Sequence, residues 1–136
     1  MKTPTVLQLE AVECGAASLA MILGYHGRIE PLAKLRQNCG VSRDGSKAAN
    51  ILRAARRYGL EANGIKASVD ALRNLQMPCI LFWEFNHFVV LEGFKKDRVY
   101  INDPAMGHRV ISIGDFERSF TGVALAMQPG DQFEKG

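Results

Sequence analysis

The chain has 136 residues, which is enough for one domain with a single sizeable hydrophobic core. Hydrophobic residues make up 47% of the chain and charged residues 23%, a balance that excludes an intrinsically disordered protein. The formal net charge of +3 is too small to indicate a nucleic-acid partner, and Arg53, Arg56 and Arg57 follow an amphipathic pattern typical of a solvated helix face.

The first half of the chain predicts three helices. Residues 14–25 are apolar almost all the way round, which is typical of a central, buried helix. Pro31 suits the first turn of a second helix, which ends near residue 40. Ser46 can cap a third helix that runs to Tyr58.

The second half predicts short strands that are rich in β-branched and aromatic residues. These strands cover residues 79–83, 87–94, 98–101, 109–113 and 123–127. The short polar connections between them favour antiparallel neighbours. Two short helices, at residues 68–75 and 114–120, lie among the strands. Helices first and strands afterwards predict an α+β fold, with N-terminal helices packed on an antiparallel β-sheet.

The sequence predicts no membrane-spanning segment. The longest apolar runs, residues 77–83 and 88–91, are far shorter than the roughly 20 residues that a spanning helix needs. The N-terminus has no signal-peptide core, so we expect a cytosolic location. From Gln128 the apolar periodicity is lost. We therefore expect one domain over residues 1–128 and the start of a linker over residues 129–136.

Three cysteines occur, and their spacing predicts neither a metal site nor a disulfide framework. Cys39 and Cys79 are expected to be structural. Cys14 begins the predicted central helix, where free backbone N–H groups and the helix dipole favour a thiolate. Gly15 beside it leaves room for a substrate backbone. As a lone residue, Cys14 could instead be a small buried hydrophobe.

A histidine and a carboxylate could form an acyl-transfer site with this thiol. His87 begins an apolar strand, and an imidazole is the usual partner of a catalytic thiol because its pKa lies near working pH. Asp103 follows the next strand along the chain. Two hairpin registers are open, with Asp103 opposite Phe88 or Val90, and either keeps the carboxylate near His87.

A glutamine upstream completes the set of candidate residues. Gln8 lies six residues before Cys14 and could donate to the oxyanion of a tetrahedral intermediate, together with the Cys14 backbone N–H. Each residue also has a structural interpretation. A glutamine is often a surface residue, a histidine at a strand edge is often structural, and an aspartate before proline is often a turn residue.

In order and spacing, these residues resemble the papain-like cysteine peptidases. They are similar in particular to the double-glycine leader peptidases, the N-terminal domains of peptidase-containing ABC transporters. The stretch from Gln8 to Gly27 resembles the cysteine motif of that family, His87-Phe-Val-Val-Leu its histidine motif, and Asp103-Pro104 its aspartate motif. The resemblance covers about residues 4–128, and three motifs in order are far more specific than any one.

One position departs from the family pattern. Many family members carry aspartate before the nucleophile, whereas this chain has Glu13. Glutamate there resembles the subgroup tied to lanthipeptide-type and other modified peptides with nitrile-hydratase-like leaders. The departure leaves every catalytic position filled.

The resemblance implies a papain-like cysteine peptidase fold and cleavage of a ribosomal precursor peptide after a Gly-Gly or Gly-Ala pair. Cys14 would attack, His87 would act as base and acid, Asp103 would orient the imidazole, and Gln8 would bind the oxyanion. The leader would bind as an amphipathic helix in an apolar groove. Substrate contacts are expected at Gly15, Gly45, Ser46, Phe85 and Asn86.

The implied partners are the precursor peptide and the membrane and ATPase domains of the transporter, to which the linker would lead. The resemblance places the domain at the cytoplasmic side of a bacterial cell membrane and implies no metal, no cofactor and no nucleic acid. The detached domain is expected to be a monomer. Two other functions stay open: a thiol amidase or acyltransferase on the same fold, and a leader-docking module that does not cleave.

Overall fold

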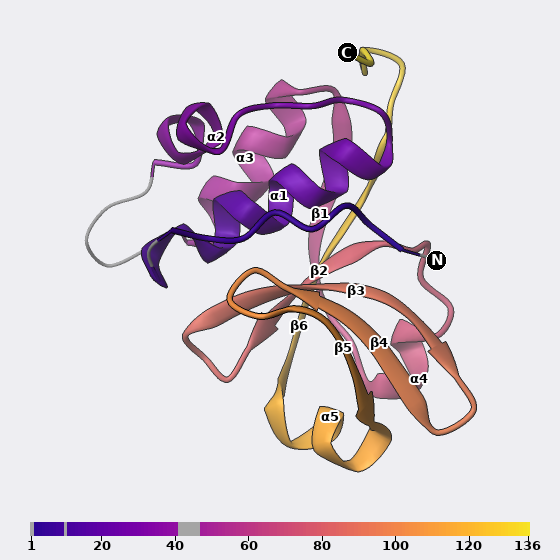
Figure 1. The fold of residues 1–136 in the computed structure, drawn as a ribbon. Coiled ribbons are helices and arrows are strands. Elements are labelled where there is room, and N and C mark those ends of the chain that lie inside the picture. The colour runs from indigo at the N-terminus through magenta and orange to yellow at the C-terminus, as the bar shows by residue number, and fades with distance from the viewer. Residues whose placement is uncertain (1, 10, 41–46) are drawn as a thin grey trace.

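The computed structural model describes residues 2–9, 11–40 and 47–136. Three helices cover one face of an antiparallel six-stranded sheet, and two short helices pack on its other face (Figure 1). This arrangement confirms the predicted α+β fold with N-terminal helices on an antiparallel sheet.

The helical layer comes first in the chain. A short 3₁₀ segment, η1, leads directly into the central helix. The elements of this layer are η1 (Ala11–Glu13), α1 (Cys14–Tyr25), α2 (Leu32–Asn38) and α3 (Ala48–Arg57).

The sheet has the strand order β1-β6-β2-β3-β4-β5. Its strands are β1 (Leu60–Lys66), β2 (Cys79–Trp83), β3 (His87–Lys95), β4 (Arg98–Asp103), β5 (Gly107–Ser112) and β6 (Phe120–Pro129). The short helices α4 (Val69–Leu72) and α5 (Ile113–Ser119) are connections between strands. Consecutive strands from β2 to β5 pair as hairpins, so short connections set most of the sheet.

Helix α1 is the centre of the helical layer. It is buried from Cys14 to Leu23, as its all-round apolar pattern predicts. Leu19 and Ile22 are fully buried, and removing such a side chain from water contributes about 1.5–3 kcal/mol each. The buried helix therefore fixes the position of its own first residue, Cys14.

Side chains of the sheet alternate between two cores, as expected for strands buried on both faces. Ile80 and Val90 point to the helical layer. Leu81 and Val89 point to the opposite core, where Phe116 of α5 packs. The sheet is thus held from both sides.

Three local features differ from the sequence expectations. β1 was not predicted, because Asn63 and Gly64 lower its strand propensity; its pairing with β6 makes it a strand. β6 extends to Pro129, two residues past the predicted end. The N-cap of α3 is Lys47, whereas the sequence predicted Ser46, which lies outside the described residues.

The residues after β6 return to the helical layer. The Gly130 N–H donates to the Gly59 carbonyl at 2.9 Å, and the Gly136 N–H donates to the Gly27 carbonyl at 3.0 Å. None of the helices in the described ranges is long and apolar enough to cross a membrane.

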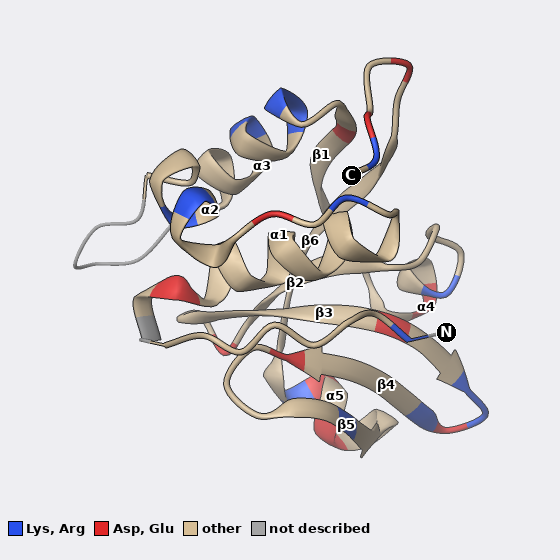
Figure 2. Ribbon diagram, turned by 45° about the horizontal axis from the view of Figure 1, so that its top comes forward, with Lys and Arg blue, Asp and Glu red and all other residues tan. Residues whose placement is uncertain are grey.

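Basic residues occur along α2 and α3 and in the turn between β3 and β4 (Figure 2). Arg53, Arg56 and Arg57 are all exposed, which confirms that they form a solvated helix face. Arg56 also donates two hydrogen bonds to the Ala62 carbonyl, at 3.0 and 2.8 Å, and so ties α3 to β1.

Candidate active site

Cys14 is the first residue of α1 and is 6% exposed. The residue before it, Glu13, occupies the cap position but makes no side-chain capping bond to the helix. The free N–H groups of the first turn therefore receive no cap from this side chain. The helix dipole adds a partial positive charge at the same end of α1, where Cys14 lies.

His87 connects the thiol to a carboxylate. Its Nε2 atom lies 2.7 Å from Asp103 Oδ1, and the Cys14 side chain is near enough to help raise the pKa of the imidazole. Because Nε2 contacts Asp103, Nδ1 is the ring nitrogen left for Cys14. One imidazole thus bridges the helical layer and the sheet.

The surroundings of His87 favour its charged form. Burial by itself lowers the pKa of His87, but the hydrogen bonds with Asp103 and Cys14 and the charges of both groups outweigh burial and raise the pKa from 6.5 to about 9. The imidazolium is then the prevailing form at neutral pH. This arrangement can support a thiolate–imidazolium pair.

Asp103 is the last residue of β4 and is 3% exposed. The Ala105 N–H donates to its Oδ1 at 2.9 Å, and Arg109 Nη1 donates to its Oδ2 at 3.4 Å. Burial by itself raises the pKa of Asp103, but the bonds from His87 and Ala105 and the charges of His87 and Arg109 hold it below 3.8. The carboxylate is therefore ionised and held on both oxygens.

A β-bulge sets the register between β3 and β4. At the turn Lys95 pairs with Arg98, but the register shifts between Leu91 and Gly93, so Val90 pairs with Asn102. Asp103 is one residue beyond that pair, which is neither of the two predicted registers. The extra residue in the bulge, Glu92, accounts for the difference.

Gln8 lies at the same site but comes from the N-terminal segment. Its backbone N–H donates to the Pro104 carbonyl at 2.9 Å, beside Asp103. The side chain is half-buried, and its Oε1 atom has no hydrogen-bond partner among the described residues. The Gln8 side chain thus lies beside His87 and Asp103 with an unpaired acceptor oxygen.

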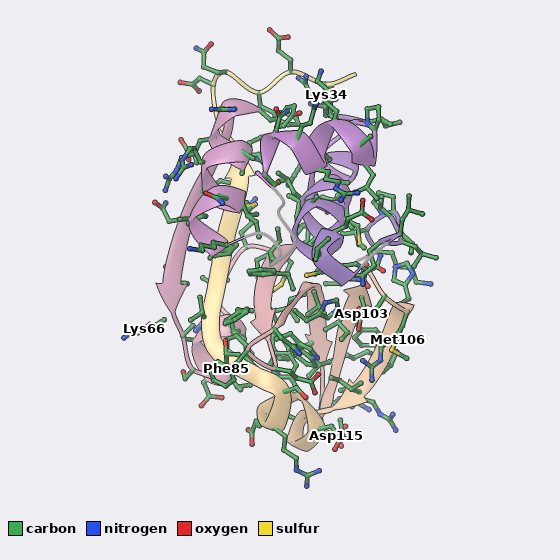
Figure 3. All side chains as sticks on the ribbon, turned by 90° about the vertical axis from the view of Figure 1, so that its left-hand side faces the viewer. Lys34, Lys66, Phe85, Asp103, Met106 and Asp115 are labelled. Carbon is green, nitrogen blue, oxygen red and sulfur yellow. The ribbon has the colours of Figure 1, made fainter. Side chains whose placement is uncertain are left out.

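A cleft of about 600 Å³ opens beside these residues. Figure 3 shows Asp103 and Met106 close together, with Asp115 of α5 further along the same side of the molecule. The cleft is lined by Gln8, Trp83, Glu84, Asn86, His87, Asp103, Ala105, Met106, Arg109, Ile111, Asp115, Arg118 and Ser119. It therefore extends from Gln8, His87 and Asp103 toward α5, and Cys14 is not among its lining residues.

The predicted substrate contacts are distributed unevenly. Asn86 is exposed and lines the cleft, whereas Gly15 is buried in the first turn of α1. Phe85 is 76% exposed at the tip of the β2–β3 turn, with a left-handed φ of 61°. Gly45 and Ser46 lie outside the described residues.

Sequence reasoning missed the residues that complete the site on the sheet side. Arg109 was assigned only to a strand, yet it contacts Asp103. The signal available was the hairpin itself, since the pairing of Asp103 with Gly107 places Arg109 nearby. Trp83 and Met106, which line the cleft, carried no comparable signal.

The other cysteines do not join this site. Burial raises the pKa of Cys39 to about 11 and that of Cys79 to about 12, so both stay protonated at neutral pH. Among the described residues, no group of three or more His, Cys, Asp or Glu side chains could hold a metal ion.

Comparisons with known proteins agree with this geometry. The chain is 42% identical over 133 residues to the colicin V secretion/processing ATP-binding protein CvaB of Escherichia coli, covering 98% of this chain and 19% of CvaB. The chain thus spans about a fifth of the length of CvaB and of the transport/processing ATP-binding protein ComA of Streptococcus pneumoniae.

Two solved structures share the fold closely. One is a double glycine motif protease from an AMS/PCAT transporter in complex with the leader peptide. It is 54% identical, with a TM-score of 0.92 over 94% of this chain and 92% of that one. The other is the peptidase domain of Streptococcus ComA, which is 27% identical, with a TM-score of 0.89 over 94% of this chain and 99% of that one.

The family assignment covers nearly the whole chain. Residues 2–132 match the Peptidase C39 family, a range that includes Gln8, Cys14, His87 and Asp103. With the CvaB identity and both structural matches, this establishes that the chain belongs to the Peptidase C39 family.

Proposed function

We propose that this chain is a cysteine endopeptidase that removes the leader from a ribosomal precursor peptide by cutting after a Gly-Gly or Gly-Ala pair. The observation that carries the proposal is the position of His87, 2.7 Å from Asp103 and beside Cys14 at the start of α1. Membership of a peptidase family and a 54% identical double glycine motif protease support the same function.

The first half of the reaction forms a thioester. The Cys14 thiolate adds to the carbonyl carbon after the small pair, and the carbonyl oxygen takes the negative charge. When this intermediate collapses, the C–N bond breaks and His87 gives its proton to the leaving amine. A raised pKa of about 9 keeps this proton on His87 at neutral pH.

The second half releases the leader. Neutral His87 takes a proton from water, and the hydroxide adds to the thioester carbon. The C–S bond then breaks, which frees the leader as a carboxylic acid that loses its proton to water, and restores the thiolate–imidazolium pair. The ionised Asp103, held by Ala105 and Arg109, keeps the imidazole oriented through both halves.

The oxyanion of each intermediate would be held by the Cys14 backbone N–H and the Gln8 side-chain amide. The location of Gln8 in the cleft, with its backbone fixed to Pro104, supports this role. Donors of this type stabilise the transition state because charge develops where they already point.

A narrow passage beside Cys14 would explain a requirement for glycine-sized side chains. Gly15, Gly45, Ser46 and the backbone of Phe85 and Asn86 would contact the extended pair. The leader upstream would bind as an amphipathic helix in an apolar groove. The relative solved with a leader peptide supports a leader as the substrate.

The wider context follows from the relatives. CvaB and ComA are named as secretion or transport/processing ATP-binding proteins, so this chain would be the peptidase domain of such a transporter, at the cytoplasmic side of the membrane. Residues 1–128 would form the domain, and residues 129–136 would start the linker. Glu13 supports the lanthipeptide or nitrile-hydratase-like subgroup.

Mass spectrometry of cleavage products tests the proposal. The substrates are synthetic peptides with an amphipathic helical leader that ends in Gly-Gly or Gly-Ala, and a Val-Val peptide serves as the negative control. We expect one cut after the small pair, abolished in Cys14→Ala and His87→Ala. Cys39→Ala, which removes a buried thiol of the helical core, should keep the activity.

The same experiment tests the docking-module alternative and the assignment of the nucleophile. Binding of the leader peptide by the wild type without any cut would indicate a docking module. Cleavage that persists in Cys14→Ala would contradict the assignment of the nucleophile.

A further inference from the structure

The N-terminal segment, residues 2–9, carries Gln8 across the molecule. We call it the N-terminal strap. It passes between α1 and the strands β3 and β4 before it reaches η1 (Figure 1). No regular secondary structure holds it over residues 2–8. Its position therefore depends on side-chain contacts.

A buried polar cluster holds the start of the strap. Thr3, Glu92 and Asn102 are 2%, 3% and 0% exposed. Both the Thr3 N–H and the Thr3 hydroxyl donate to Glu92 Oε2, the latter at 2.9 Å. Asn102 Nδ2 donates to the Thr3 hydroxyl at 3.0 Å. The strap is thus joined to two neighbouring strands at once.

A second threonine and a histidine extend this cluster toward the surface. Asn102 Nδ2 lies 3.2 Å from the Thr5 hydroxyl, which lies 3.3 Å from His108 Nδ1. The other ring nitrogen of His108 lies 3.1 Å from Glu92 Oε2. A buried network in which each member has partners specifies one arrangement, because a shifted strap would leave these groups unpaired.

The far end of the strap is fixed by different contacts. The Gln8 N–H donates to the Pro104 carbonyl, and the Leu9 N–H donates to Glu13 Oε1 at 2.7 Å. Glu13 directly precedes Cys14 in the chain. Gln8 therefore lies in the short segment between the cluster around Thr3 and the Leu9–Glu13 contact.

These contacts connect the N-terminal strap to the strand end that carries Asp103. Asn102 directly precedes Asp103, so the strand end that anchors the strap also carries the catalytic carboxylate. Glu92 is the extra residue of the bulge that sets the register of the same strand. We propose that Thr3, Glu92 and Asn102 are positioning residues, which place the Gln8 amide at the oxyanion site through the N-terminal strap. This inference rests on the proposed function, in which Gln8 binds the oxyanion.

Changes on the strap itself test the inference without altering the sheet. Thr3→Val keeps the shape of the side chain but removes the hydroxyl that contacts Glu92 and Asn102, and Thr3→Ser keeps the hydroxyl. Thr121→Val is the matched control, since the Thr121 hydroxyl donates to the Phe82 carbonyl at 2.9 Å, away from the strap. The substrate is the Gly-Gly leader peptide.

We expect Thr3→Val to lower kcat roughly 10-fold with little change in KM, because a misplaced oxyanion donor is lost from the transition state only. Thr3→Ser should restore most of the rate, and Thr121→Val should keep it. In the Gln8→Ala background, Thr3→Val should cost nothing further, since the donor that it places is already absent. Amide exchange at Gln8 should become faster in Thr3→Val.

The outcomes distinguish the two claims. If Gln8→Ala lowers kcat but Thr3→Val leaves it unchanged, or if the two losses multiply, the positioning role is wrong and the proposed function stands. If Gln8→Ala leaves kcat unchanged, Gln8 does not bind the oxyanion, and both the oxyanion assignment and the positioning role are overturned.

Discussion

At the scale of single residues, the proposed mechanism depends on the proton that His87 carries between Cys14 and Asp103. The pKa of His87 rises from 6.5 to about 9, although burial alone would lower it. A raised folded pKa stabilises the fold fully below pH 6.5, and this contribution is lost as pH rises through about 9. In the proposed mechanism, the same proton passes to the leaving amine.

The pH profile of cleavage should reflect this proton. We expect kcat/KM to fall on the alkaline side with an apparent pKa near 9, because neutral His87 cannot protonate the leaving amine. Steady-state rates from pH 6 to 10 would measure it. A profile that stays flat to pH 10 would show that His87 is not the acid.

Removing the charge of Asp103 should shift the alkaline fall in kcat/KM, which we call the alkaline limb, to lower pH. Asp103→Asn takes away the anion that raises the pKa of His87, so the alkaline limb should shift to lower pH and kcat should fall roughly 10-fold or more. Asp70→Asn, at an exposed position of α4, should leave the profile of the wild type unchanged. An unshifted limb in Asp103→Asn would contradict the proposed coupling.

At the scale of elements, apolar periodicity predicted the buried helices and strands. It did not predict features that depend on strand pairing, namely strand β1 and the register between β3 and β4. Helix α1 and strands β2 and β3 were predicted because their apolar residues repeat strongly. β1 was missed, because only its partner β6 makes the stretch around Asn63 and Gly64 a strand. Gly93, an isolated glycine inside a strand, is a local signal for the bulge at Glu92, but the spacing of the hairpin does not include it, so spacing alone gave the wrong register for Asp103.

The central helix should dominate stability. Leu19→Ala removes a fully buried side chain of α1 and should lower the free energy of unfolding by about 2–5 kcal/mol. Urea unfolding followed by circular dichroism would measure the change. Ile29→Ala, at a side chain that is 81% exposed, should change it by less than about 0.5 kcal/mol. Equal effects of the two substitutions would refute the central role of α1.

At the scale of the whole molecule, the site joins segments that are distant in sequence. Cys14 comes from the helical layer, His87 and Asp103 from the sheet, and Gln8 from the strap between them. These four residues could be predicted from their order in the sequence and from their chemical type. It did not predict Arg109 beside Asp103, or the cluster around Asn102, because those contacts exist only after the layers pack.

Near the end of the chain, the backbone of Gln132 and Phe133 packs against Gly59. Gly59 has a left-handed φ of 88°, and a Cβ there would lie 2.6 Å from the backbone of Gln132 and Phe133. Gly59→Ala should therefore lower the free energy of unfolding by at least about 1 kcal/mol. Gly114→Ala is the control, because a Cβ there meets nothing within 4 Å, and it should be neutral or slightly stabilising. Thermal unfolding of both variants would measure this difference, and equal melting temperatures would contradict it.

The most direct test of the thiolate–imidazolium pair is the alkylation rate of each cysteine by iodoacetamide at pH 7, followed by peptide mass spectrometry and by cleavage activity. Cys39 and Cys79, whose pKa values burial raises to about 11 and about 12, should react slowly. Cys14 should react much faster, activity should fall in step with its modification, and His87→Ala should slow the reaction. Alkylation of Cys14 no faster than that of Cys39, or equally fast in His87→Ala, would contradict the account.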